Sequence, residues 1–305
     1  MQNLTIWKYL SLPWVLMSFF FFASFIFLAF FKGTQIEYLT NNYLLGLFKN
    51  TFVLSFLTAF ISALIAMPLA ILVTFYNFPG KKFFSWSLSL SIAFPAYVYA
   101  FIYVGMFEYS SPISSYLRDF GITLPSIKNL FGASIILSMA LFPYIYLLLR
   151  VKLASVGLDL FRAAKSLGNN NTASILKVII PSLFPVVVAG MTLVIFETIA
   201  DFGGVSTLRI ETFTVGIYNA WFGYQSYFSA ARLAGYLLMF VFVIIFIAKF
   251  YESKQSNLAQ KTSEVFDGIE LVHYKSFLAT LYCSVIFTIV FLIPLAQLLI
   301  WSFAE

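Results

Sequence analysis

The sequence has little of what soluble enzymes depend on: among 305 residues there are one cysteine, one histidine, and only 10% charged residues. Because Cys283 stands alone, no internal disulfide and no CxxC motif is available. The chain also lacks a Walker-type G-x4-G-K-[ST] motif, HExxH and GxSxG, which excludes the usual signatures of ATP hydrolysis, zinc proteolysis and serine hydrolysis. We therefore expect a non-catalytic chain with no cofactor, in which no metal ligand can be firmly assigned.

The sequence is instead rich in hydrophobic residues. Hydrophobic residues make up 61% of the chain, and runs of about 18 or more apolar residues recur, each long enough to cross a ~30 Å hydrocarbon layer as a helix. The fold class predicted is all-α, a polytopic transmembrane helix bundle of about seven spans. The predicted spans are Pro13–Phe31, Thr51–Tyr76, Phe84–Phe107, Phe131–Leu149, Val178–Ile199, Ala230–Tyr251 and Phe277–Phe303.

The basic residues indicate an orientation. The net charge of +6 is modest and spread over the loops, which favours a membrane protein over a nucleic-acid-binding one. When the N-terminus is placed in the cytoplasm, the larger share of the 18 lysines and arginines falls on the cytoplasmic side. The first apolar run is longer than a signal-peptide core and has no convincing cleavage site, so we read it as a retained span. We predict a multi-pass protein of the cell inner membrane with a cytoplasmic N-terminus.

Small residues and prolines suggest how the spans pack and where they bend. The second span carries a stripe of small residues that would let another helix approach closely, although alanine and serine are common in any membrane helix. Proline inside the second and third spans, at Pro68 and Pro95, predicts kinks. The stripe consists of Ser55, Ala59, Ala63, Ala66 and Ala70.

Composition also suggests boundaries. We predict an N-terminal span with its outer loop over 1–44, a main domain over 45–251, and a polar cytoplasmic linker over 252–276. His273 lies in this linker and is expected to be solvated. The last segment, 277–305, reads as the first span of a second, incomplete unit.

The segment 150–177 interrupts the apolar pattern with small and polar residues. A short helix is predicted with Asp159 near its start and Lys165 near its end, where each charge suits the helix dipole. Gly168 suits a left-handed stop, and Asn169–Asn171 or Thr172 can cap the next helix. Leu160, Phe161, Ala164 and Leu167 are expected on one face. From the residues alone, this elbow serves equally well as a docking site for a soluble protein or as an amphipathic helix on lipid headgroups.

A resemblance bears on this choice. Arg162-Ala163-Ala164-Lys165-Ser166-Leu167-Gly168, followed by Val178, Ile180 and Pro181, resembles the coupling loop of binding-protein-dependent ABC transporter permeases. The resemblance implies the MetI-like permease fold, and it implies that this loop sits in a groove of a separate cytoplasmic ATPase subunit. Arg162 departs from the family pattern, in which an acidic residue stands at this position. The coupling residues implied are Asp159, Arg162, Ala163, Ala164, Leu167, Gly168 and Pro181.

A second stretch, "FETIADFGGVSTLRIETFTVGIYNAWFG" over 196–223, resembles the ferric-iron branch of these permeases. Together the matches cover about residues 45 to 250. They imply ferric iron as cargo, delivered by a periplasmic iron-binding protein, and a second permease half or a second copy to complete the pore. Thiamine, phosphonate, sulfate and polyamine are the alternative cargoes, since the binding protein mostly sets the selectivity.

Two carboxylates lie within the second stretch. Glu197 and Asp201 are four residues apart and share one helical face. Carboxylates at membrane depth usually face a polar cavity, and ferric iron prefers oxygen ligands, so both are candidates for the translocation path. Equally, they could brace the turn at Gly203 and Gly204. An intramembrane enzyme using this pair is the weaker alternative, because no nucleophile or metal ligand set accompanies it.

Overall fold

The computed structural model describes residues 2–30, 41–252 and 268–303. The described chain is mostly helical and divides into two compact units, one formed by 1–51 with 211–250 and the other by 52–210 with 251–305. One helix, α2 (Asn41–Phe75), contributes its first part to the first unit and the rest to the second. The all-α fold predicted from the apolar runs is confirmed.

The first unit is built around a small apolar core. Its members are Leu47, Phe213, Ala220, Ala230 and Leu233. Polar groups of α2 tie this core to the chain before α11: the Asn50 side-chain amide donates to the Glu211 carbonyl oxygen (2.9 Å), and the Thr51 hydroxyl accepts from the Phe213 amide (3.0 Å). The remaining elements of the unit are α1 (Gln2–Phe30), α11 (Phe213–Tyr218), the π-helical turn η4 (Asn219–Gly223) and α12 (Tyr227–Glu252).

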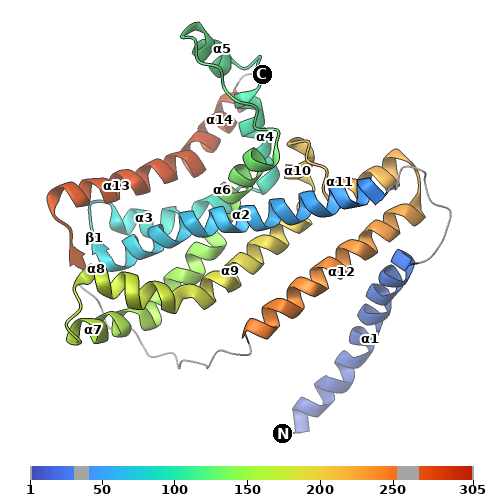
Figure 1. The fold of residues 1–305 in the computed structure, drawn as a ribbon, viewed down its shortest axis with the longest axis horizontal. Helices are drawn as coiled ribbons and strands as arrows, with labels where there is room; N and C mark the ends of the chain where they lie inside the picture. Colours follow the sequence, from blue (N-terminus) through green and yellow to red (C-terminus); the bar gives the residue numbers. More distant parts are fainter. Residues whose placement is uncertain (1, 31–40, 253–267, 304–305) are drawn as a thin grey trace. The chain divides into compact units, whose positions relative to one another are not determined.

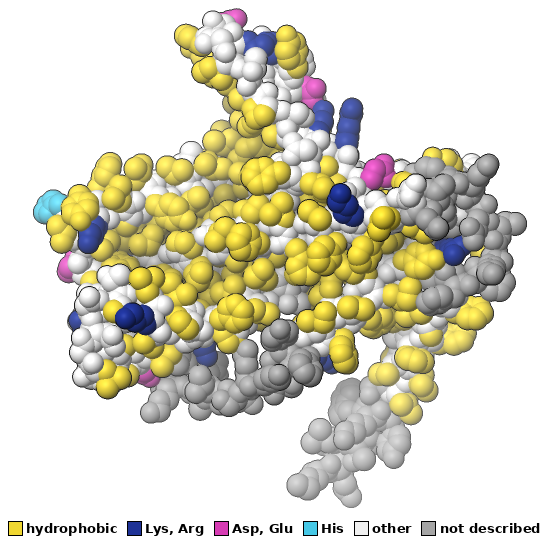
Figure 2. Space-filling model, in the orientation of Figure 1, with side chains coloured by type: hydrophobic (Ala, Val, Ile, Leu, Met, Phe, Trp, Pro, Cys, Tyr) yellow, Lys and Arg dark blue, Asp and Glu magenta, His cyan; other side chains and the backbone are white. Residues whose placement is uncertain are grey.

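The second unit holds the remaining elements. Within it α6 and α9 pack along each other, and α4 packs against α6 and α10. On the face in view, the side chains over its long helices are predominantly hydrophobic (Figure 2). The elements are β1 (Tyr76–Asn77), α3 (Lys81–Ser87), η1 (Leu90–Ala93), α4 (Ala96–Phe107), α5 (Pro112–Asp119), α6 (Leu130–Lys152), η2 (Leu153–Gly157), α7 (Leu158–Ser166), α8 (Asn171–Ser174), η3 (Ile175–Ile179), α9 (Ile180–Ala200), α10 (Gly203–Thr207), β2 (Ile269–Glu270), α13 (His273–Phe287), η5 (Thr288–Leu292) and α14 (Ile293–Ser302).

Long apolar helices account for most of the predicted spans. Among the described residues, five helical segments are long and apolar enough to cross a membrane, and a sixth is counted if one bent pair is a single span. The first predicted span corresponds to α1, of which Leu12–Phe27 is found as a shorter apolar helix. The five long segments are Asn42–Phe75, Leu130–Ser155, Asn171–Ala200, Tyr227–Lys249 and His273–Ser302.

The third predicted span, over 84–107, is not one continuous helix. The chain bends by 89° between Lys81–Ala93 and Ala96–Asp119. Pro95 lies at this break with φ −57° and ψ 150°, and it precedes the first residue of α4. Proline cannot donate a backbone hydrogen bond and disfavours helix in the residue before it, so the predicted kink at Pro95 is a complete break. In contrast, α2 continues through Pro68 as a single helix.

The small-residue stripe of α2 is buried. Its five members expose between 0% and 7% of their surface, whereas Phe56, Phe60 and Leu64 on the same helix are exposed. The small residues therefore line the packed face of α2, as the prediction of close packing requires.

The last helical segment packs within the second unit. A two-residue parallel ladder pairs Tyr76 with Ile269 and Asn77 with Glu270. From there α13, η5 and α14 run on as a long segment (Figure 1) that contacts α3, η1 and α4. Of the predicted linker, residues 253–267 lie outside the described residues, and the helix begins at His273, within the range predicted as linker. The His273 side chain is exposed.

Candidate functional site

Two features lie at opposite ends of the continuous segment Asn171–Ala200, which is 30 residues long and therefore about 45 Å from end to end. At its start is the elbow formed by α7 and α8, and α10 follows its end (Figure 1). Residues at that end, two carboxylates among them, line a cavity.

The elbow has the predicted caps. At the end of α7, Gly168 adopts φ +85°, its amide donates to the Lys165 carbonyl (3.0 Å), and the Asn169 amide donates to the Ala164 carbonyl (3.2 Å). This pair of bonds is a Schellman motif, which requires a left-handed residue where Gly168 stands. The Asn170 side chain then accepts from the Ala173 amide (2.7 Å) and starts α8. Local sequence alone thus explains the sharp reversal.

The two faces of α7 differ from the prediction at one position. Phe161 and Ala164 are buried, and the Phe161 ring lies 5.3 Å from that of Phe75 at the end of α2. The sequence predicts Leu167 on this apolar face, but its side chain is 83% exposed. Leu167 is the C-cap residue of α7, and the chain reverses at Gly168 directly after it, so Leu167 lies at the end of the elbow rather than within the packed helix.

The open surface of the elbow is mixed in character. Besides Leu167, the exposed residues of the elbow include Asp159, Arg162, Ala163 and Gly168, and Lys165 is exposed as well. Pro181, also exposed, is the second residue of α9. Five of the seven predicted coupling residues are therefore exposed on the elbow, while Ala164 is buried and Pro181 lies further along the chain.

At the C-terminal end of α9, a cavity of about 330 Å³ is lined by residues of α6, of α9 and of the helix break at Pro95. Glu197 and Asp201 both contribute to its wall, so the structure brings the two predicted carboxylates to one cavity. The remaining lining residues were not predicted from the sequence. They are Ile92, Phe94, Pro95, Ala96, Tyr97, Ala140, Leu141, Tyr144, Ala200 and Phe202.

Asp201 is held by the backbone that follows it. Its carboxylate accepts from the Val205 amide at 2.9 Å, and a Cβ at Gly204 would lie only 2.6 Å from the same oxygen. Burial raises the pKa of the Asp201 carboxyl, while the amide hydrogen bonds from Val205 and Gly204 act to lower it. Asp201 therefore caps α10, which corresponds to the bracing role considered for it from sequence.

Glu197 differs from Asp201 in being exposed on the cavity wall. It stands one turn earlier on α9 than Asp201 and shares the cavity wall with Tyr144 of α6. Lysine, arginine and histidine are missing among the residues that line this cavity. Among the described residues, no cluster of three or more His, Cys, Asp or Glu side chains is arranged to bind a metal ion.

Pro95 is the residue from which the other lining residues of this cavity could have been predicted. Because the chain breaks there, Phe94, Ala96 and Tyr97 turn toward α9 and α10. A Cβ at Gly203 would lie 2.8 Å from the Cβ of Tyr97, so only glycine permits α10 to approach α4 this closely.

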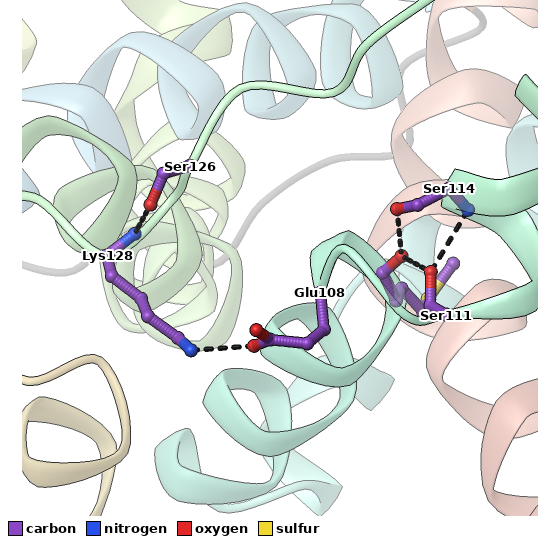
Figure 3. Close-up of polar contacts among 6 residues, drawn as sticks. Glu108, Ser111, Ser114, Ser126 and Lys128 are labelled. Carbon is purple, nitrogen blue, oxygen red and sulfur yellow. Dashed lines mark hydrogen bonds and ion pairs between the residues drawn. The ribbon is translucent and has the colours of Figure 1, made fainter. Parts of the chain in front are cut away.

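A second, smaller cavity of about 220 Å³ lies where α4 gives way to α5 and to the loop before α6. Lys128 forms an ion pair with Glu108 there, with 2.6 Å between Nζ and Oε2, and Ser111 accepts from the Ser114 amide to start α5 (Figure 3). Arg118 stacks on the Tyr109 ring, 3.8 Å from its centre. Each charged side chain of this cavity thus has a partner, Glu108 with Lys128 and Arg118 with Tyr109.

Five helical segments among the described residues are long and apolar enough to cross a membrane, which is the pattern of a polytopic membrane protein. Residues 62–264 match the family described as "Binding-protein-dependent transport system inner membrane component". This match covers more than half of the 305 residues, and the chain belongs to this family.

Individual relatives are distant. The chain is 24% identical over 169 residues to "Sulfate transport system permease protein CysT" of Escherichia coli, covering 55% of this chain and 60% of that protein. It is 26% identical over 203 residues to "Probable sulfate transport system permease protein cysT" of Prototheca wickerhamii, covering 65% of this chain and 78% of that one. It is 25% identical over 187 residues to "Fe(3+)-transport system permease protein FbpB 2" of Haemophilus influenzae, covering 61% of this chain and 34% of that protein.

A solved structure shares the fold. The crystal structure of an amino acid ABC transporter with histidines superposes with a TM-score of 0.50 at 18% sequence identity, covering 70% of this chain and 94% of that one. The permease fold implied by the coupling-loop resemblance is confirmed. The narrower assignment to the ferric-iron branch is not confirmed, because relatives named for sulfate and a relative named for ferric iron match at similar sequence identity.

Proposed function

We propose that this chain is a membrane-spanning, non-catalytic permease subunit of an ATP-driven importer. The observation that carries the proposal is the elbow surface, where Leu167 is 83% exposed although Phe161 on the same helix is buried against Phe75 of α2. An exposed leucine at a rigid, capped helix end suits insertion into a groove of another protein. The proposed occupant of this surface is a cytoplasmic ATPase subunit.

The proposed partners follow from the same argument. A periplasmic binding protein delivers the cargo, and a second permease half or a second copy of the chain completes a pore, since alternating access needs two bundles that move against each other. Co-expression with a tagged ATPase of the same importer tests the first contact. We expect the two to co-purify, and we expect Leu167→Asp to abolish this while Leu176→Asp, at a second exposed leucine, leaves it intact.

As cargo we propose an inorganic oxyanion of the sulfate type. Support comes from the relatives named for sulfate transport, one of which covers 65% of this chain. The assay is uptake of radioactive sulfate by cells that lack their own sulfate importers and carry this chain with its ATPase and binding protein. Sulfate uptake above the level of an empty-vector strain is the expected result.

A second candidate cargo is ferric iron, and a different observation favours it. The cavity at the end of α9 contains Glu197 and Asp201 but no lysine or arginine in its lining. A cavity with net negative charge attracts a hard cation and repels an oxyanion. Parallel uptake assays with radioactive ferric iron separate the two, since only one cargo should accumulate in an ATP-dependent manner.

A further inference from the structure

Helix α4 has two differently occupied faces. Tyr97 lines the cavity, whereas Tyr99 and Tyr103 are buried at 0% and 7% exposure. Positions 97 and 99 are about 200° apart around a helix, so they point to opposite sides. Tyr99 and Tyr103 are four residues apart and share the side that faces the last helical segment.

That last segment contains a defect in its own hydrogen bonding. Between α13 and α14, the Ile293 amide donates to the Thr288 carbonyl, five residues back, which makes a π-helical turn over 288–292. Pro294 follows and has no amide hydrogen, so it cannot give the Val290 carbonyl the bond that an α-helix would supply. The Ile289 carbonyl likewise loses its α-helical donor, because the Ile293 amide is already engaged elsewhere.

The two tyrosines meet these two carbonyls. The Tyr99 hydroxyl donates to the Val290 carbonyl oxygen at 2.6 Å, and the Tyr103 hydroxyl donates to the Ile289 carbonyl oxygen at 2.5 Å. In a hydrocarbon environment an unsatisfied carbonyl is costly, and no water is at hand to replace the missing donor. Each hydroxyl therefore supplies a bond that the helix itself cannot make.

Close packing continues along α4. The rings of Phe94 and Phe291 lie 5.5 Å apart, and those of Phe101 and Trp301 lie 5.3 Å apart. A Cβ on Gly105 would approach the Trp301 ring to 3.1 Å. The contact thus extends from the break at Pro95 to the end of α14.

From this match of donors and acceptors we propose that Tyr99 and Tyr103 form a tyrosine latch. The latch fixes the π-helical turn at Pro294 to α4, so that the last helical segment and the cavity-lining end of α4 move as one body. Tyr99 and Tyr103 are positioning residues in this scheme, since they act on the cavity through α4. The latch does not depend on which cargo is carried.

A double-mutant cycle tests the latch. The purified chain is unfolded by titration with SDS in mixed micelles, and the equilibrium constant is followed by circular dichroism. We expect Tyr99→Phe to raise the unfolding constant about three- to fifteen-fold, the range of interhelical hydrogen bonds in membranes. In a Pro294→Ala background the restored amide can serve Val290, so the effect of Tyr99→Phe should shrink to less than half in logarithmic units.

Tyr146→Phe is the matched control. Tyr146 is also buried, and its hydroxyl donates to the Ser85 carbonyl at 3.0 Å rather than to the last segment. Removal of the Tyr146 hydroxyl should change the unfolding constant by the same factor in the Pro294→Ala background as in the native protein. Equal effects of Tyr99→Phe in the two backgrounds would overturn the latch, because the hydroxyl would then be independent of the proline defect.

The native cysteine provides a second measurement that needs no unfolding. Cys283 is buried in α13, one to two turns before the π-helical turn. We expect Tyr99→Phe together with Tyr103→Phe to increase the rate of Cys283 modification by a small thiol reagent several-fold, and Pro294→Ala to restore much of the protection. Unchanged protection in the doubly substituted protein would mean that the segment is held without the hydroxyls.

Discussion

The two ends of the continuous segment Asn171–Ala200 are fixed in different ways. At the elbow, the reversal depends on Gly168 and Asn170, whose bonds join residues within five positions of one another. At the cavity, the arrangement depends on close approaches between helices, such as Gly203 to Tyr97 on α4. The first end presents an exposed surface and the second encloses a cavity. The difference teaches that a docking surface can be built from local signals, while a cavity wall needs tertiary contacts.

The largest effect is expected at the elbow. Gly168 has φ +85° and a Cβ there would meet nothing within 4 Å, so its requirement is conformational and not steric. We expect Gly168→Leu to abolish uptake and ATPase stimulation while the spans stay inserted, because a left-handed leucine costs about 1–2 kcal/mol and turns the elbow away. Uptake and ATPase activity in reconstituted vesicles measure this.

Gly168→Asn is the control, because asparagine tolerates the left-handed conformation far better than leucine. It should retain most of the activity. Full uptake by the Gly168→Leu protein would remove the elbow from the coupling mechanism.

A smaller effect, and on stability, is expected from Gly204→Ala at the cavity end. The new Cβ would lie 2.6 Å from the Asp201 carboxylate and 3.2 Å from Leu137. Overpacking of this kind destabilises by about 1–3 kcal/mol, which the SDS titration should detect. Gly46→Ala, where the Cβ meets nothing within 4 Å, should be neutral or stabilising. Equal stability of the Gly204→Ala and Gly46→Ala proteins would show that the cavity end tolerates an added methyl group as well as an open helix face does.

Substitutions at the two carboxylates should affect different properties, stability for Asp201 and uptake rate for Glu197. Asp201→Ala removes the oxygen that accepts from the Val205 amide and should cost about 1 kcal/mol of stability. Glu197→Gln should leave stability unchanged and alter the uptake rate, because Glu197 is exposed on the cavity wall.

The direction of the Glu197→Gln effect reports the charge of the cargo. Removal of a negative charge should speed uptake of an oxyanion and slow uptake of ferric iron. A protein that assembles normally and transports either cargo at the unaltered rate would exclude Glu197 from the path.

The least perturbing experiment concerns orientation. In a Cys283→Ala background, we predict that a cysteine at Ser166 is labelled from the cytoplasmic side and one at Ser206 from the outside. Ser114 is a natural outer site by sequence, but it is buried, so the exposed neighbour Ser115 replaces it. A predicted cytoplasmic site at Ser256 lies outside the described residues. Labelling of the Ser166 position by an impermeant reagent from outside would reverse the predicted orientation.

Prediction succeeded where chemistry is local. Apolar runs located the long helices, and glycine, asparagine and charge placed the caps of α7 and α8. Prediction failed where a side chain's environment depends on another element: Leu167 is exposed and not buried. The segment over 84–107 is also bent by 89° near Pro95 and is not one continuous helix. No pattern within α4 indicated that Tyr99 and Tyr103 would bond to a helix almost two hundred residues later.

The sequence by itself determined the class of protein, because the hydrophobic effect and backbone hydrogen bonding leave an apolar run of this length little choice but a helix. It also determined the elbow, through a glycine that alone adopts the required conformation without strain. Tertiary structure decided that Glu197 and Asp201 line one cavity together with residues of α6 and of the break at Pro95. It also decided that the last helix is bonded to α4, since hydrogen bonds and close contacts between distant segments depend on positions that no single stretch of sequence specifies.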